Sequence, residues 1–328
     1  MSVVAFIVIA FMLTAYVLLD GYDLGVAAVT PLVARTDRER EGSMRSIGPF
    51  WNGNEVWLIA AGGALFALFP QAYASAFSGF YLPLIVVLWL LMFRGIAIEL
   101  RSHFPSEIWH QFWDACFFAS SVLLILLFGV ALGNLLRGVP LGPQGYFSGT
   151  FDELLNPYAL LVGIFAVVAL AMHGAVFLVL RIDGPAVQRV RRLVTRLWPA
   201  VVVLYVAVTA ATLAERGIGF SWIDVIPVLT LVALGALLFF SINGRERGAF
   251  IASSLFLASL LLQAAVTMYP YLIPSLPPRK GGISIFDASP SPVALASALT
   301  VVIVGLVVVI IYSVLVARQM AGKIVVED

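Results

Sequence analysis

The chain has 328 residues, of which 62% are hydrophobic and only 11% are charged. A mean hydropathy of +1.03 and a formal net charge of +1 are typical of a polytopic membrane protein and exclude a soluble globular one. No basic stripe is present, which argues against nucleic acid as a partner. The single cysteine, Cys116, excludes an internal disulfide and a multi-cysteine metal site, so we expect no metal in this chain.

Nine apolar segments follow one another along the chain, most of them close to the ~20 residues that cross ~30 Å of hydrocarbon. They predict an all-α protein with nine transmembrane helices in one integral membrane domain, residues 1–328. No basic stretch precedes the first segment, so we expect it to stay as an anchor rather than to be cleaved as a signal peptide. The predicted helices cover residues 3–33, 54–69, 79–98, 114–135, 157–180, 197–214, 223–242, 249–269 and 293–317.

The positions of lysine and arginine predict the orientation. When the loops are assigned alternately to the two sides, most of the 19 basic residues fall on one side. The other side has only Arg137, Arg216, Arg279 and Lys280. Because cytoplasmic loops are enriched in basic residues, the N-terminus is expected outside and the C-terminus in the cytoplasm, as an odd number of spans requires.

Three acids lie inside the first two predicted helices. Asp20 and Asp23 end the uncharged start of the first helix, and residues three apart share one helix face. At 1.5 Å per residue Asp20 lies about 26 Å along this helix, at a depth similar to that of Glu55 in the second. Clustered intramembrane acids can relay protons, so we predict a proton pathway through Asp20, Asp23 and Glu55. A purely structural hydrogen-bond network between the two helices is the alternative.

Polar and aromatic side chains surround Glu55 at the start of the second predicted helix. They are Trp51, Asn52, Asn54 and Trp57. A belt of tryptophans at the membrane interface would explain Trp51, but it accounts poorly for the two asparagines. This pattern therefore favours the mouth of a polar cavity.

The third predicted helix ends with Arg94, Glu99 and Arg101. Arg94 and Glu99 are five residues apart and do not pair well within one straight helix. We therefore expect Arg94 to reach an acid on another helix, with Asp20, Asp23 and Glu55 as the candidates. Arg101 is at least as readily explained by a side chain that reaches the cytoplasmic headgroups.

His173 is the only one of the three histidines inside a predicted helix. A haem in a helical bundle commonly takes His or Met axial ligands, and one buried histidine without an evident partner disfavours it. Met172 and Met268 are further candidate axial ligands, so a haem in this chain stays an open alternative. We expect His173 to be a hydrogen-bonded histidine between helices.

At these residues the chain resembles subunit II of the cytochrome bd-type quinol oxidases. The similarity extends over essentially the whole chain and is densest in the first 160 residues. It is carried by residues 20–25 (DGYDLG), 51–58 (WNGNEVWL), 61–67 (AGGALFA), 76–81 (AFSGFY), 93–95 (FRG), 133–140 (GNLLRGVP) and 155–157 (LNP).

This resemblance implies a respiratory complex that oxidises quinol and reduces dioxygen to water. Two b-type haems and one d-type haem are then expected in the larger partner, subunit I, and none in this chain. For this chain it implies two four-helix bundles plus a peripheral helix, and a cytoplasmic proton route towards haem d. Some members also hold a quinone here as a structural lipid, so a bound quinone is a further expectation.

The resemblance also bears on single residues and on partners. Asp20 and Asp23 match the acidic motif of the family, whereas Asn52 stands where many members carry an acid and Glu55 where some carry an amide. We therefore expect Glu55 to take the role of that acid. The implied partners are subunit I, membrane lipids and, in some complexes, a small single-helix accessory subunit, all in a bacterial or archaeal cytoplasmic membrane.

Two other functions fit the sequence. A stand-alone proton-coupled transporter would also need intramembrane acids, but transporters often have broken helices at matching places in two halves. Here the polar residues concentrate in the first three predicted helices, which favours the oxidase subunit. A purely structural assembly subunit without a proton role is the second alternative.

Overall fold

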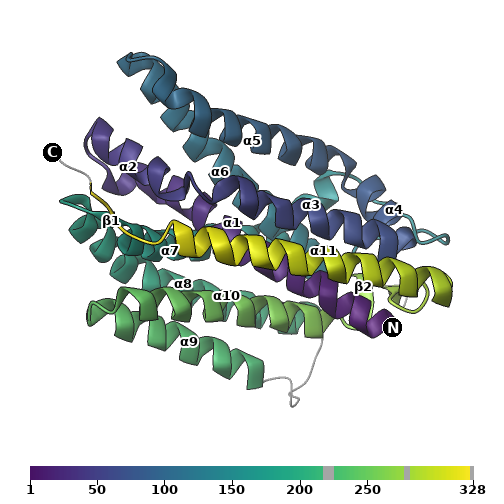
Figure 1. The fold of residues 1–328 in the computed structure, drawn as a ribbon. Coiled ribbons are helices and arrows are strands. Elements are labelled where there is room, and N and C mark those ends of the chain that lie inside the picture. The colour runs from purple at the N-terminus through teal and green to yellow at the C-terminus, as the bar shows by residue number, and fades with distance from the viewer. Residues whose placement is uncertain (217–224, 277–280, 326–328) are drawn as a thin grey trace.

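The chain is a bundle of long helices that run roughly side by side, with the two termini at opposite ends (Figure 1). The structure is a computed structural model that describes residues 1–216, 225–276 and 281–325. Its α-helices are α1 (Ser2–Val33), α2 (Asp37–Ile47), α3 (Trp51–Leu68), α4 (Pro70–Gly79), α5 (Tyr81–Leu100), α6 (Glu107–Arg137), α7 (Pro157–Arg181), α8 (Ala186–Arg216), α9 (Val225–Ile242), α10 (Glu246–Met268) and α11 (Pro292–Gln319). The short elements are 3-10 helices at Arg101–His103 and Asp152–Leu155 and strands β1 (Ile182–Asp183), β2 (Tyr271–Pro274), β3 (Gly282–Ser284) and β4 (Ile324–Val325).

Eight helices in the described part of the chain are long and apolar enough to cross a membrane, which confirms a polytopic helical membrane protein. The second predicted segment is the exception. It corresponds to α3, which has 18 residues and begins with two asparagines and Glu55, so its hydropathy is too low. The prediction of nine transmembrane helices therefore exceeds what length and composition support by this one helix.

Several helix ends differ from the predicted boundaries. α6 begins at Glu107 instead of 114 and α8 at Ala186 instead of 197, because the helical backbone continues past the apolar residues that defined those segments. The third segment corresponds to α5, and the short helix α4 that precedes it was not predicted. The predicted start of the seventh helix at 223 lies outside the described residues, as do Arg279 and Lys280.

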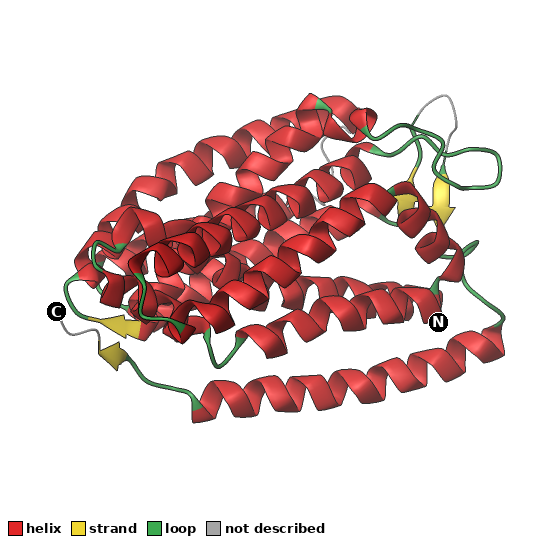
Figure 2. Cartoon of the chain, turned by 90° about the horizontal axis from the view of Figure 1, so that it is seen from above, coloured by secondary structure: helices red, strands yellow, loops and turns green. Residues whose placement is uncertain are grey.

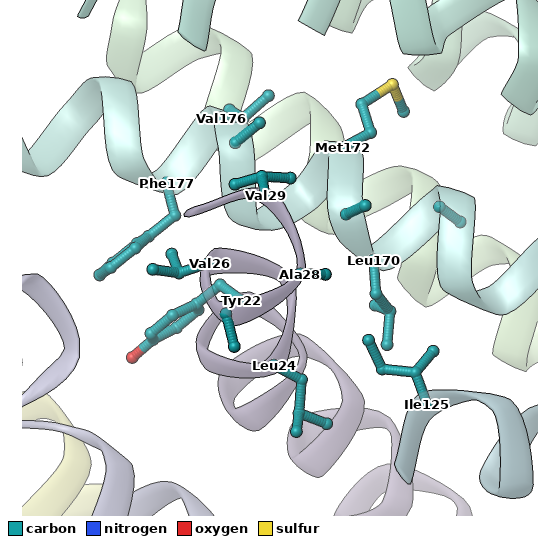
Figure 3. Packing of buried hydrophobic residues seen from close by; sticks show 14 of the residues in the cluster. Tyr22, Leu24, Val26, Ala28, Val29, Ile125, Leu170, Met172, Val176 and Phe177 are labelled. Atoms are coloured by element: carbon teal, nitrogen blue, oxygen red, sulfur yellow. The ribbon is translucent and has the colours of Figure 1, made fainter. Parts of the chain in front are cut away.

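Helices α1 and α7 form the centre of the bundle. They approach closely where Gly25 faces Gly174, since a Cβ atom on Gly25 would clash with the carbonyl oxygen of Leu170. Small residues allow this kind of close helix contact in membranes. Figure 3 shows the apolar packing around the contact, with Leu24 and Val29 of α1 beside side chains of α6 and α7. All residues from Asp20 to Thr30 are buried, so the acidic motif of α1 lies inside the protein.

The remaining helices surround this centre. α6 and α8 pack on α7, α9 packs on α10, and α3 packs on α1. α11 lies along the outside of α3, and only two of its residues, Leu295 and Leu299, are buried (Figure 2). β4, which follows α11, pairs in parallel with β1 after α7 and ties the C-terminal segment to the end of the bundle.

Candidate functional site

A fully buried ion pair between Asp20 of α1 and Arg94 of α5 forms the middle of the candidate site. Arg94 Nη1 donates to Asp20 Oδ2 at 2.8 Å, and Nη2 donates to Oδ1 at 2.5 Å. Both side chains have no solvent exposure. Two parallel N–H···O bonds are the strong geometry of an arginine–carboxylate pair, so this contact fixes α5 against α1.

The same guanidinium reaches two further carboxyl groups. Arg94 Nη1 lies 3.4 Å from Glu55 Oε1, and Nη2 lies 3.9 Å from Asp23 Oδ2. Asp23 is fully buried, whereas the side chain of Glu55 on α3 is 22% exposed. The three acids singled out in the sequence therefore surround one arginine, and Glu55 is the one open to the surface of this chain.

Asn54 connects the cluster to the backbone of α1. Its Nδ2 donates to Asp23 Oδ2 at 2.7 Å and lies 2.9 Å from the Tyr22 hydroxyl and 3.3 Å from the Leu19 carbonyl oxygen. Tyr22 in turn stacks on Phe177 of α7, with ring centroids 4.0 Å apart. These contacts hold Asp23 in one orientation beside α3.

The charges in this cluster do not balance. Three carboxyl groups face one guanidinium, so full ionisation would leave two negative charges without a partner in a buried site. Within the described residues Asp23 Oδ1 and Arg94 Nε also have no hydrogen-bond partner. A proton on a carboxyl group removes one excess charge, so the cluster has the composition of a site that can bind and release protons.

The other predicted site residues divide between the edge of the cluster and the surface. The Trp51 ring is buried against Gly95, one residue after Arg94. Trp57 is buried with its Nε1 3.4 Å from Ser313 Oγ of α11. Asn52 and Glu99 are exposed on the isolated chain and make no side-chain contact with the cluster.

Arg101 belongs to a second ionic cluster at the end of α5. Arg101 is almost fully buried and donates to Asp114 at 2.6 Å and to Asp37 at 2.5 Å. His110 lies 3.2 Å from Asp37, and Arg40 lies 4.0 Å from Asp114. Arg101 thus points to protein carboxylates instead of the headgroups.

Asp37, Asp114 and Tyr22 belong to the two clusters, although no sequence pattern assigns them a function. Asp114 is the first residue of a predicted helix, and an acid at the edge of a span is a reason to look for a basic partner. Asp37 lies on α2, a helix that was not predicted. Tyr22 stands between the two aspartates, within the motif of residues 20–25.

His173 is completely buried on α7, and both of its ring nitrogens are engaged. Nδ1 lies 2.7 Å from Ser253 Oγ, and Nε2 lies 3.0 Å from the Leu18 carbonyl oxygen. The ring stacks on Phe250 at a centroid distance of 5.3 Å. An axial haem ligand needs a free ring nitrogen, so this histidine does not fit that role.

In the described ranges no group of three or more His, Cys, Asp or Glu side chains has an arrangement that could hold a metal ion.

Comparison with known proteins places the chain in a family. The sequence model described as "Cytochrome bd terminal oxidase subunit II" matches residues 1–320. The chain is 33% identical to "Cytochrome bd-I ubiquinol oxidase subunit 2" of Escherichia coli (strain K12), over 98% of this chain and 94% of the relative. It is 34% identical to "Cytochrome bd ubiquinol oxidase subunit 2" of Bacillus subtilis (strain 168), over 62% of this chain and 61% of the relative.

A solved structure supports the fold. The bd oxidase of Geobacillus thermodenitrificans includes a chain with a TM-score of 0.78 at 18% sequence identity, and the match covers 97% of this chain and 98% of that one. At this identity the structural likeness shows the fold alone. The family match and the identity over nearly full length show more: the chain belongs to the cytochrome bd terminal oxidase subunit II family.

Proposed function

We propose that this chain is the non-haem subunit II of a bd-type quinol oxidase and that its buried acids supply protons from the cytoplasm to a larger, haem-bearing subunit I. Family membership supports the oxidase complex. The proton role rests on one observation: three carboxyl groups surround the single guanidinium of Arg94, so the cluster carries titratable charge that no described cation balances.

The proposed route begins at Glu55, whose side chain is partly exposed, and continues to Asp23 and Asp20, which are fully buried. Arg94 keeps the three carboxyl groups within reach of one another. Asn54 fixes one oxygen of Asp23 and leaves Oδ1, which has no other partner among the described residues, to take up a proton. The exposed Asn52 and Glu99 take no part in this route.

The proposed topology has nine spans, with α3 as the ninth. α3 is too polar at its start to qualify by composition, but two of its polar residues, Asn54 and Glu55, contact Asp23 and Arg94. The termini at opposite ends of the bundle support an odd number of spans, with the N-terminus outside and the C-terminus in the cytoplasm (Figure 1). We place the protein in a bacterial cytoplasmic membrane, as two four-helix bundles with α11 at the periphery.

Subunit I is the proposed place of two b-type haems and one d-type haem, and of the conversion of dioxygen to water. His173 does not fit an axial haem ligand, since both of its ring nitrogens are engaged. Membrane lipids and a small single-helix accessory subunit are further proposed partners.

A structural quinone in this chain would fit an apolar cavity of about 160 Å³ that is lined by α1, α6, α7, α8 and α10. The Tyr205 hydroxyl donates to Gln263 Oε1 at 3.4 Å, and the amide NH2 group of Gln263 supplies the N–H donor that a carbonyl oxygen of such a ring needs. The walls are otherwise mostly apolar, so the ring would act there as a lipid that fills space between helices.

The stand-alone transporter is not favoured, because the named relatives are oxidase subunits. A purely structural subunit remains the competing function, and two single substitutions separate it from the proton pathway. Glu55→Gln and Asp23→Asn keep the size and hydrogen bonding of each side chain but remove its titratable proton. Both variants should assemble with subunit I, with oxidase turnover and proton uptake reduced about tenfold or more, as for a general proton-transfer group.

Turnover is measured as quinol-dependent oxygen consumption, and proton uptake as the pH change in vesicles that contain the purified complex. Glu99→Gln, an exposed acid on α5 outside the cluster, is the matched control and should leave both rates unchanged. Wild-type rates in both cluster variants would leave only the structural role.

A further inference from the structure

A second cavity, of about 540 Å³, opens at the end of the bundle where the C-terminal segment crosses α7 and α10. Its wall is apolar, with Phe177, Phe250 and Val316 from three different helices. Its mouth is charged and holds Arg181 and Arg247, together with residues of the C-terminal segment. The cavity therefore has an amphipathic lining, with the charged end on the side where the basic residues of the chain concentrate.

Arg181 is a buried cation with no carboxylate partner among the described residues. Arg181 is only 8% exposed, and its Nη1 donates to two neutral carbonyl oxygens, of Met320 at 2.6 Å and Gly322 at 2.5 Å. The guanidinium lies 5.2 Å from the ring centroid of Phe50, and Nε has no hydrogen-bond partner in the described part of the chain. A buried charge without a counter-ion is costly, so this geometry points to an anion as the missing partner.

Glu246, the carboxylate at the mouth, is already occupied. Arg191 Nη2 lies 2.7 Å from Glu246 Oε1, and Lys323 Nζ lies 2.8 Å from Oε2. Arg247 is exposed at the same mouth, and no described carboxylate pairs with it. Arg181 and Arg247 together leave an excess of positive charge at the opening.

We propose that this cavity binds a phospholipid with an anionic headgroup, with the phosphate at Arg181 and Arg247 and an acyl chain along the apolar wall. Basic pockets between transmembrane helices on the cytoplasmic side are typical sites for anionic headgroups. The apolar part is open to the membrane, since Ile251 on its rim is 59% exposed. A lipid satisfies both ends of the cavity, whereas a free phosphate satisfies only the mouth.

The inner end of the cavity reaches Tyr22 and Asn54, which contact the buried acids. The lipid site is nevertheless separate from the proton route, because the three acids pair with Arg94 and, within the described residues, form no ion pair with Arg181 or Arg247. Loss of lipid binding and loss of proton uptake can therefore be distinguished.

Binding of fluorescent phosphatidylglycerol to the delipidated full chain, purified with the subunits that accompany it, tests this site. Arg181→Gln should weaken binding by about tenfold or more, the usual effect of losing a charge-assisted hydrogen bond to a buried group. Arg247→Gln, on the surface and harmless to folding, should weaken it by a smaller factor. The matched control is Arg245→Gln, two residues away and equally exposed but outside the lining, which should bind like the wild type.

Unchanged affinity in both Arg181→Gln and Arg247→Gln would overturn the proposal. Competition by inorganic phosphate distinguishes the source of the anion: the lipid site requires unlabelled phosphatidylglycerol to displace the probe far more effectively, and equal displacement would contradict a lipid. Glu327 and Asp328 are acids outside the described residues, and a variant that ends at Val325 lacks both of them. It should retain binding, and its failure to bind would also count against the site.

Discussion

The two ionic clusters of this protein both combine arginine with carboxyl groups, but in different proportions. Around Arg94 three carboxyl groups share one guanidinium, and Asp20, Asp23 and Arg94 have no exposure at all. Around Arg101 the acids Asp37 and Asp114 face Arg101, Arg40 and His110, and the side chain of Asp37 is 50% exposed. The first cluster has an excess of acid in a buried place, whereas the second has two arginines and His110 for two acids, one of which is half exposed.

This difference separates a site that can change its charge from a contact that holds helices together. In the Arg101 cluster the charges of Asp37 and Asp114 are stabilised by Arg101, and Asp37 also by water. The cluster therefore joins α2, α5 and α6 without protonation of either acid. In the Arg94 cluster the excess acid has no such compensation. Charge balance and burial, more than residue identity, therefore indicate where a proton is held.

The largest expected effect comes from removing Arg94 from the Arg94 cluster. Arg94→Gln leaves three carboxyl groups without a counter-ion, and breaking a buried pair in this way costs about 3–5 kcal/mol. We expect the variant to assemble poorly, measured as the yield of complex and its thermal unfolding midpoint. Arg94→Lys keeps the charge but not the two parallel bonds, so it should recover part of the yield; wild-type stability in Arg94→Gln would contradict the pairing.

Removing Arg101 from the Arg101 cluster should have a smaller effect. Arg101→Gln loses hydrogen bonds to Asp37 and Asp114, of which Asp37 can be solvated by water, so we expect a loss of about 1–3 kcal/mol. Oxygen consumption by the assembled complex should stay near that of the wild type. A loss of turnover with normal assembly would show that this cluster also serves proton transfer.

The buried cluster could largely be expected from the sequence. The rise of a helix alone predicts that Asp20, Asp23 and Glu55 lie at similar depth. Arg94 is expected to reach one of them, because Glu99, five residues away, does not pair well with it on one straight helix. Long uncharged helices make such depth arguments reliable, since the membrane fixes their axis. The sequence could not say which carboxylate Arg94 would contact most closely, because that depends on how α1, α3 and α5 are rotated.

The surface cluster could not be expected in the same way. Asp37 lies on α2, whose 11 residues are mostly polar and carry no membrane-crossing pattern. Asp114 lies within α6, seven residues after the start of that helix, and the apolar pattern marks only where hydrocarbon begins. Contacts near the membrane surface depend on the folding of loops that hydropathy does not describe.

The position of Asn52 could not be predicted from the sequence either. Asn54 and Glu55, which follow it on α3, contact the Arg94 cluster, while the side chain of Asn52 is exposed.

The smallest expected effect concerns Glu39 on α2, outside the membrane. Burial alone would raise the pKa of Glu39, but hydrogen bonds from the backbone of Arg35 and Thr36 and from the Arg189 side chain outweigh it and hold the pKa below its ordinary value. A lowered pKa means that the ionised form stabilises the folded state. This contribution is complete above the ordinary pKa and is lost as the pH falls through the lowered one.

Glu39→Gln should therefore be less stable than the wild type at neutral pH, and the difference should shrink as the solution is acidified below about pH 4. The measurement is the thermal unfolding midpoint of both proteins across this range. Glu41→Gln on the same helix is the control, since no ion pair of Glu41 is seen in the described residues, and it should show no such convergence. A difference between Glu39→Gln and the wild type that stays constant from neutral to acidic pH would contradict the lowered pKa. It would mean that protonated Glu39 stabilises α2 as well as ionised Glu39 does.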